Sequence, residues 1–232
     1  MPAKYTLVIG TATWSSWSLR PYLALHQIGA PFETVMVPLR YSAESRKAIL
    51  RHSPSGKVPL LKINGLASSS EAVGHKKSGK SVKVWDSLAI CETLNERHPK
   101  ARLWPKNAAD RAIARAYAAE MHSGFPNVRD QLSLVFGQKL PLPALRDDTS
   151  REIERILAAW DAALKAHKGP FLFGRFSIAD AMYAPVVSRF DSYGVNVAKP
   201  VRAYMDRVLA LPGMIAWGKL ARQEVEKGLL NR

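Results

Sequence analysis

The chain has 232 residues, of which 47% are apolar, enough for one or two domains with a sizeable core. It contains one cysteine, Cys91, which excludes an intrachain disulfide framework and a cysteine-based zinc cluster. No apolar run reaches membrane-spanning length, and the first residues lack the apolar segment of a signal peptide. We therefore expect a cytoplasmic protein with no membrane partner.

The formal net charge is +15, and the basic excess is spread along the chain. Residues 1–98 carry 13 basic and 6 acidic side chains, and residues 99–232 carry 21 and 13. Such a balance raises nucleic acid or an anionic surface as a partner, but no nucleic-acid-binding motif accompanies it. The one local cluster, Lys76, Lys77, Lys80 and Lys83, is typical of a solvated loop. We expect no nucleic-acid partner and a basic field that steers small anions.

The first hundred residues alternate between strand and helix patterns. Residues 5–9 form a short apolar run typical of a buried strand. A helix is predicted after this strand, because Leu19, Leu23 and His26 recur at helical spacing. Gly29 and Pro31 are expected to end it. Further strands are predicted at 32–37, 58–63 and 82–85, and further helices at 43–50 and 87–97. The predicted order is strand–helix–strand–helix–strand–strand–helix.

The last two of these strands are separated by a polar insertion. Asn64-Gly65 alone would close a tight hairpin. The Ser, Gly and Lys residues that follow cannot bury enough apolar surface to order themselves. We expect residues 65–81 to be mobile.

Helical periodicity dominates from about Ala108 onward. Residues 153–164 show apolar positions at i, i+3, i+4 and i+7, with Ser150 as the expected N-cap. Ser177-Ile178-Ala179-Asp180 is typical of a capping box, and two more helices are predicted at 201–210 and 214–225. A Pro-bounded linker divides the chain into an α/β domain, 1–98, and an all-α domain, 105–232.

The first motif with chemical content is Trp14-Ser15-Ser16-Trp17-Ser18, between the first strand and the first helix. A hydroxyl here stands beside a helix N-terminus, whose free N–H groups and dipole favour negative charge. A thiol bound at that place loses its proton more readily. The alternative is that these serines only cap the helix.

The second motif is Lys57-Val58-Pro59. Proline at a strand start cannot donate to the ladder, and a cis Val58–Pro59 bond would turn the Val58 backbone toward a cleft. An extended peptide could then pair with Val58 as an added strand. The alternative is an ordinary turn before an edge strand.

The third motif is Asp86-Ser87, where a strand passes into a helix. Ser87 and the first free N–H groups suit a carboxylate. Asp86 suits an ammonium group in a charge-assisted bond. The alternative is a simple helix cap.

A thiolate site, a backbone peptide site and an amino-acid head-group site together suit one tripeptide with a γ-glutamyl end. The combination resembles the soluble glutathione transferases over nearly the whole chain. The matching motifs are 15–18, 56–59, 86–90 and 177–180. The resemblance implies a thioredoxin-like N-terminal domain, an all-helical second domain, glutathione as co-substrate and no metal. It also implies a structural role for the capping box.

Within this family the Ser-Ser-x-Ser pattern resembles the zeta class, and the serine start also resembles theta. The match implies thiol activation by Ser15, with Ser16 the near competitor one register away. Trp17 would line the same loop, and Lys57, Val58, Pro59, Asp86 and Ser87 would bind the tripeptide. The zeta pattern has Cys in place of Trp17 and Gln or Glu in place of Asp86. Cys91 stands inside a helix, which argues against omega-type thiol exchange.

The resemblance places an acceptor site between the domains. Its candidate wall residues are Trp14, Met121, His122 and Phe125, although helical aromatics and Met also serve as plain core. The predicted function is conjugation of glutathione to a small hydrophobic electrophile, in a homodimer. The alternatives are a non-catalytic binding or regulatory protein and a glutathione-dependent isomerase.

Overall fold

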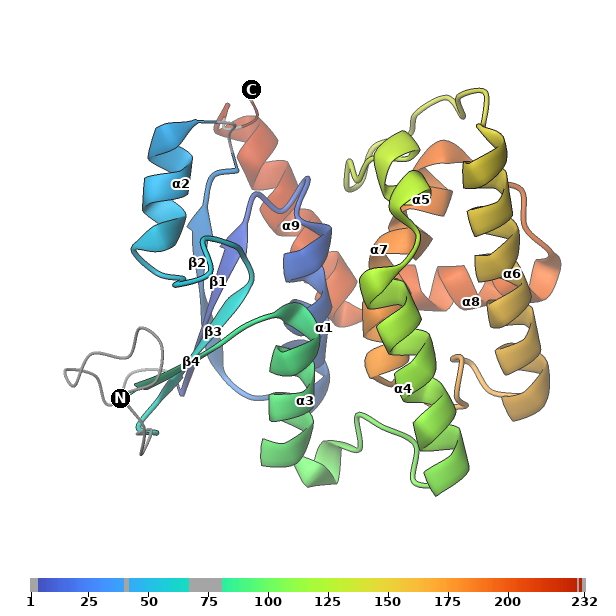
Figure 1. Cartoon of the computed structure of the whole chain (residues 1–232), viewed down its shortest axis with the longest axis horizontal. Coiled ribbons are helices and arrows are strands. Elements are labelled where there is room, and N and C mark those ends of the chain that lie inside the picture. The colour runs from blue at the N-terminus through green and yellow to red at the C-terminus, as the bar shows by residue number, and fades with distance from the viewer. Residues whose placement is uncertain (1–3, 40–41, 67–80, 229, 231–232) are drawn as a thin grey trace.

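A four-stranded sheet organises the first half of the chain (Figure 1). The computed structural model describes residues 4–39, 42–66, 81–228 and 230, so most of the insertion expected to be mobile lies outside it. The sheet order is β2-β1-β3-β4. The strands are β1 (Tyr5–Gly10), β2 (Phe32–Val37), β3 (Leu60–Asn64) and β4 (Ser81–Val84). β1 pairs in parallel with β2 and antiparallel with β3, which pairs antiparallel with β4.

Alternation along β1 sends side chains to two different cores. Leu7 and Ile9 join the main core, which includes α1 (Ser16–Ile28) and α3 (Ser87–Arg97). Val8 faces the opposite way and packs in a small cluster with Ile49 of α2 (Ala43–Leu50). Successive side chains of a strand point to opposite faces, so the sheet is covered on both sides. The predicted order of elements in this half is confirmed.

The segment after Pro59 differs from the expectation. The Val58–Pro59 bond is cis, and β3 begins at Leu60 rather than at Val58. β3 lies between β1 and β4, so the alternative that this segment leads into an edge strand is wrong. The physical reason is that Leu60, Leu61 and Ile63 are all fully buried, which suits an inner strand.

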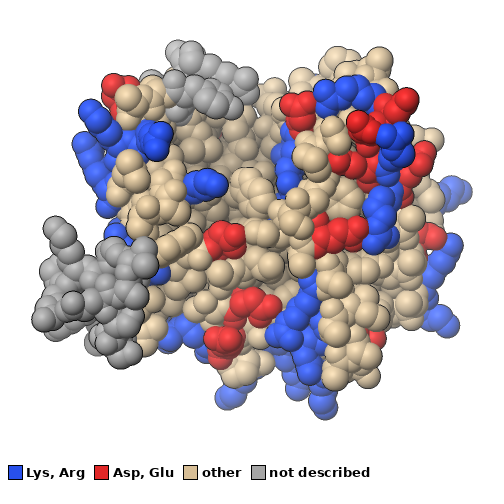
Figure 2. All heavy atoms as spheres, viewed as in Figure 1, with Lys and Arg blue, Asp and Glu red and all other residues tan. Residues whose placement is uncertain are grey.

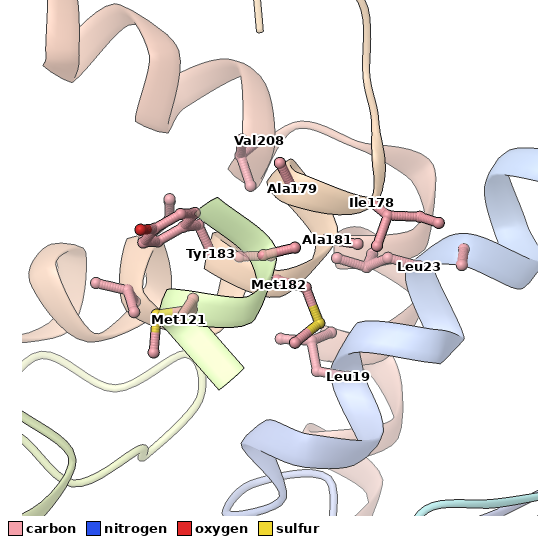
Figure 3. Packing of buried hydrophobic residues seen from close by; sticks show 14 of the residues in the cluster. Leu19, Leu23, Met121, Ile178, Ala179, Ala181, Met182, Tyr183 and Val208 are labelled. Atoms are coloured by element: carbon pink, nitrogen blue, oxygen red, sulfur yellow. The ribbon is translucent and has the colours of Figure 1, made fainter. Parts of the chain in front are cut away.

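The second half is helical. A short 3₁₀ turn, η1 (Pro99–Ala101), precedes it. Its described helices are α4 (Ala108–Ser123), α5 (Pro126–Gln131), α6 (Asp147–His167), α7 (Ile178–Tyr193), α8 (Lys199–Leu209) and α9 (Pro212–Glu226). Almost every residue of α7 is buried, and α7 packs against both α1 and α4. Figure 3 shows Leu19 and Leu23 of α1 beside Met182 and Ile178 of α7, so one core joins the two halves.

The start of α6 corrects one expectation. Ser150 is not its N-cap, because the helix begins at Asp147 with Arg146 in the capping position. The Ser150 N–H already donates to the Arg146 carbonyl at 2.9 Å, as in the body of a helix. Asp147 and Asp148 lie in the first turn, where negative charge is favoured by the helix dipole.

The capping box at the start of α7 is confirmed. The Asp180 carboxylate accepts from the Ser177 N–H at 2.8 Å and from the Ser177 hydroxyl at 3.0 Å. Its other oxygen accepts from the Leu172 N–H at 3.1 Å. Asp180 is fully buried, so the box also ties the preceding loop to the helix.

Helix α9 crosses back to the first half of the chain and lies beside α1 (Figure 1). A Cβ at Gly213 would lie 2.8 Å from the end of the Leu23 side chain and 3.1 Å from Cβ of His26, so a larger residue would require these α1 side chains to shift. The Trp217 ring packs edge-on against Tyr22, with centroids 4.9 Å apart. The C-terminal helix therefore supports the sheet domain directly.

No helix in the described part of the chain is both long and apolar enough to cross a bilayer. Figure 2 shows Lys and Arg at the margins of both halves, with Asp and Glu among them, and a recess in the surface between the halves.

Candidate functional site

Ser15 caps α1 at the point where the turn after β1 ends. Its side-chain oxygen accepts from the Ser18 N–H at 3.4 Å, and its hydroxyl donates to Ser18 Oγ at 2.7 Å. Ser18 Oγ also accepts from the Gly10 N–H at 3.2 Å. The capping alternative for Ser15 is therefore present in the structure, and a role toward a thiolate requires its hydroxyl to turn.

Ser16 is the first residue of α1 and is 6% exposed, against 4% for Ser15. Among the described residues, none is hydrogen-bonded to the Ser16 hydroxyl. Both serines thus lie at the positive end of the helix dipole.

Trp17 is half-buried and is flanked by two cations. The guanidinium carbon of Arg20 lies 4.1 Å from the Trp17 ring centroid, and that of Arg129 lies 5.0 Å away. The His122 ring meets Trp17 edge-on at 5.2 Å. These residues come from α1, α4 and α5, so the Trp17 ring fastens the helical half to the loop that carries the serines.

Arg20 is the least satisfied charge in this region. It is 1% exposed, and neither Nε nor Nη1 has a hydrogen-bond partner among the described residues. Burial, with a smaller effect of Arg129, lowers the pKa of Arg20 to about 9, which leaves it charged at neutral pH. A buried charge without a counter-ion is costly, and it makes the space near the start of α1 and α3 favourable for an anion.

A second buried cation, Arg189 of α7, adds to this field. Burial lowers the pKa of Arg189 to about 10. Its guanidinium donates to the carbonyls of Leu132 and Arg129, at 3.2 Å for the latter. Sequence reasoning missed Arg20, Arg129 and Arg189, because a lone Arg on a helix carries no pattern that marks it as buried.

Asp86 occupies the N-cap of α3. Its Oδ1 accepts from the Leu88 N–H at 3.1 Å and from the Ala89 N–H at 3.4 Å. Its Oδ2 lies 2.8 Å from Nε2 of His122 on α4, an ion pair between the two halves when the imidazole is protonated. The Asp86 side chain is 53% exposed, so it stays open to a second cation. Ser87, next in the chain, is fully buried, and its hydroxyl has no partner in the described part of the chain.

The segment with Val58 lies near the start of β3. Lys57 is exposed, Val58 is half-buried and Pro59 is buried. No backbone group of the described residues bonds to the N–H or C=O of Val58. These two groups are therefore open to an extended peptide.

Cys91 lies inside α3 and is fully buried. Burial raises the pKa of its thiol to about 12, so it is a neutral thiol at physiological pH. A nucleophilic cysteine needs thiolate character and access, and Cys91 has neither.

The four candidate wall residues of the acceptor site separate into two pairs. Met121 is 1% exposed and Phe125 is 6% exposed, and both belong to the main core; Figure 3 shows Met121 there. Trp14 and His122 keep exposed surface. Only this second pair offers side-chain area to a ligand in the structure described.

The described residues contain no group of three His, Cys, Asp or Glu side chains that could hold a metal ion. What the geometry brings together is a helix N-terminus with two serines, an exposed carboxylate and an unpaired buried guanidinium.

Family models agree with this geometry. The model of the N-terminal domain of glutathione S-transferase matches residues 14–97, and that of its C-terminal domain matches residues 143–207. The chain belongs to the glutathione S-transferase family. The first match covers the loop with Ser15 and the cap at Asp86, and the second covers the capping box of α7.

Known relatives share about a quarter of their residues with this chain. The chain is 26% identical to a probable maleylacetoacetate isomerase of Caenorhabditis elegans over 204 residues, 87% of this chain and 86% of the relative. It is also 26% identical to glutathione S-transferase 1 of Dianthus caryophyllus over 188 residues, 80% of this chain and 78% of that one.

Solved structures share the fold. A glutathione transferase homologue from Burkholderia, crystallised with bound glutathione, has a TM-score of 0.67 and 23% identity; the match covers 94% of this chain and 98% of that one. Glutathione transferase Omega 1C from Trametes versicolor also has a TM-score of 0.67, with 17% identity and 99% and 98% coverage. The expected α/β thioredoxin-like domain followed by a helical domain is confirmed.

Proposed function

We propose that the protein conjugates the thiolate of glutathione to a small hydrophobic electrophile. The observation that carries the proposal is the placement of Ser15 at the N-terminus of α1, the helix that also holds Arg20, whose buried Nε and Nη1 have no hydrogen-bond partner among the described residues. Helix N–H groups and a buried cation both favour a negative sulfur.

Ser15 acts as a hydrogen-bond donor and not as a nucleophile. Its hydroxyl turns from Ser18 Oγ to the sulfur, and the Ser18 hydroxyl then donates to the Ser15 oxygen across the same 2.7 Å. One charge-assisted bond is worth roughly 1.5–3 kcal/mol, which corresponds to about one or two pKa units of the thiol. The glutathione thiol releases its proton to solvent. The thiolate then forms a C–S bond while the leaving group departs with its electron pair.

The rest of the tripeptide has separate partners in this proposal. The open Val58 backbone pairs with the peptide, with Lys57 and Pro59 beside it. Ser87 and the N-terminus of α3 hold the γ-glutamyl carboxylate, and Asp86 holds the ammonium group. Trp17 and Ser16 line the thiol loop, and Trp14 and His122 face the acceptor. The support is that Ser15 and Asp86 cap the starts of α1 and α3, and that His122 of the second half contacts both Asp86 and Trp17.

Asp86→Asn is expected to raise the KM for glutathione about tenfold or more, with kcat changed less than threefold. Asn retains the cap of α3, because its side-chain oxygen still accepts from Leu88 and Ala89. The change therefore removes only the charge that binds the ammonium group, worth roughly 1.5–3 kcal/mol. Steady-state kinetics with varied glutathione measures the effect.

His122→Asn is the matched variant, because it removes the same ion pair from the other side. Its KM for glutathione should stay equal or fall, since Asp86 is left to the ligand. An equal rise in both variants would mean that the link between the halves, not ammonium binding, is responsible.

Two measurements test the proposed function. The thiolate of bound glutathione absorbs in the ultraviolet, so its titration gives the apparent pKa of the thiol. Conjugation to a generic aryl halide gives turnover. A normal thiol pKa and no conjugate would refute the proposal, and binding without conjugation would favour the non-catalytic alternative.

A glutathione-dependent isomerase is the second candidate. The favouring observation is that a relative aligned over 87% of the chain is named a probable maleylacetoacetate isomerase. Trp17 stands where the zeta pattern has Cys, which weighs against the same isomerase activity in this protein. Cis–trans isomerisation of maleylacetoacetate with no net loss of glutathione would identify it.

A homodimer, a cytoplasmic location and a role in detoxification complete the proposal, with domains at 1–98 and 105–232. The dimer rests on the resemblance. Sedimentation at micromolar concentration is expected to show about twice the chain mass of 25.7 kDa. A monomer there would remove this part of the proposal.

A further inference from the structure

The carboxylate of Glu224 reaches from the last helix into the turn that precedes Ser15. Glu224 is 4% exposed. Its Oε1 accepts from the Ala12 N–H at 2.5 Å, and its Oε2 accepts from the Thr13 N–H and the Thr13 hydroxyl, each at 2.9 Å. All three partners donate, which suits an ionised carboxylate.

The carbonyls of the same two residues are also held from the second half of the chain. The Trp217 indole N–H donates to the Ala12 carbonyl at 2.9 Å. The Phe136 N–H donates to the Thr13 carbonyl at 3.0 Å. Every backbone polar group of Ala12 and Thr13 is therefore bonded to a residue more than a hundred positions away.

This turn leads directly into the thiol site. The Ser15 N–H donates to the Thr11 carbonyl at 2.8 Å, so the turn closes on the serine itself. Thr13 is two residues from Ser15, and the orientation of its peptide groups decides where the Ser15 hydroxyl lies. Misplacement of a catalytic donor by about 1 Å can cost a hundredfold in rate.

We propose that Glu224 is a positioning residue for the thiolate site: its carboxylate fixes the 12–13 turn and thereby aims Ser15. The inference rests on the proposed function, since it concerns the donor to the glutathione sulfur. Helix α9 of the second half thus holds a turn that belongs to the first domain. Without the carboxylate, two buried N–H groups and a hydroxyl lose their acceptor, and the turn relaxes to recover hydrogen bonds.

The direction in which the pKa of the bound thiol changes distinguishes a positioning role of Glu224 from an effect of its charge alone. The Glu224 carboxylate is bonded to Thr13, which is two residues from Ser15, so removal of its negative charge alone would lower the pKa of a bound thiol. Misplacement of the Ser15 hydroxyl would raise the pKa of the bound thiol. The two effects have opposite signs.

The experiment titrates the ultraviolet thiolate absorbance of bound glutathione in wild type, Glu224→Gln and Glu224→Asp. Gln keeps the size and removes the charge; Asp keeps the charge and shortens the reach. Both are expected to raise the apparent thiol pKa by about one unit and to lower kcat about tenfold at neutral pH. The KM for glutathione should change less than twofold. Glu226→Gln, an exposed acid on the same helix, is the matched control and should behave as wild type.

A lowered or unchanged thiol pKa in Glu224→Gln would overturn the inference, even with reduced thermal stability. If that variant does not fold, Trp217→Phe keeps an aromatic ring beside Tyr22 and removes the hydrogen bond to the Ala12 carbonyl. A rise in thiol pKa in the same direction then supports the inference, and no rise overturns it. Failure of wild type to form a thiolate would instead refute the proposed function, so the two failures are distinct.

Discussion

Ser15→Ala is expected to lower turnover at neutral pH about a hundredfold while the KM for glutathione changes little. The loss of one donor to a developing or resident negative charge typically costs two to three orders of magnitude. Asp86, Ser87 and Val58 still bind the tripeptide, so affinity survives. The pH–rate profile should shift upward by about one or two units, because bulk base supplies the thiolate at higher pH.

Two control variants make this result interpretable. Ser15→Thr keeps a hydroxyl and should restore much of the rate. Asn107→Ala removes the cap of α4, where Asn107 accepts from the Ala109 and Asp110 N–H groups. It should cost about 1 kcal/mol of stability, as the lost cap of Ser15 does, with no change in the pH profile.

Ser16→Ala decides the register. Ser16→Ala should change turnover and the pH–rate profile less than Ser15→Ala does. An unchanged profile for Ser15→Ala beside a collapsed one for Ser16→Ala would move the role by one residue, and two unchanged profiles would exclude a serine mechanism.

Asp180→Ala is expected to lower the free energy of unfolding by about 3–5 kcal/mol. The change leaves two buried N–H groups and a hydroxyl without an acceptor, each at roughly 1–3 kcal/mol before relaxation. It also frees the start of α7, the helix at the centre of the core. Urea denaturation measures the change. Asp148→Ala removes an exposed first-turn acid of α6 and should cost less than about 1 kcal/mol; equal losses would refute the role of burial.

The same carboxyl predicts a pH dependence. Burial raises the pKa of Asp180 from 3.8 to about 6, so between these values the folded state holds a proton that the unfolded state releases. Its contribution to stability is full below pH 4 and falls as the pH rises through 6. Asp180→Asn cannot titrate, so its stability should depend less on pH in this window. Parallel curves for the two proteins would contradict the prediction.

Local signals in the sequence determined the order of elements and the ends of several helices. The strand at 32–37, the helices at 43–50 and 87–97 and the capping box of α7 lie where the pattern predicts them. Apolar period, caps and glycine stops act over a few residues, so they can be read without knowledge of the fold. The positions of Ser15 and Asp86 at helix starts follow from the same signals.

The surroundings of these residues were decided by the tertiary structure alone. Glu224 meets Ala12 across 212 positions, and nothing local distinguishes it from the exposed Glu226. Arg20 becomes a buried cation because α7 packs against α1, and Asp86 meets His122 because α4 packs beside α3. Such contacts depend on which faces the whole chain buries, since burial, and not spacing along the chain, sets the cost of leaving a charge or an N–H group unpaired.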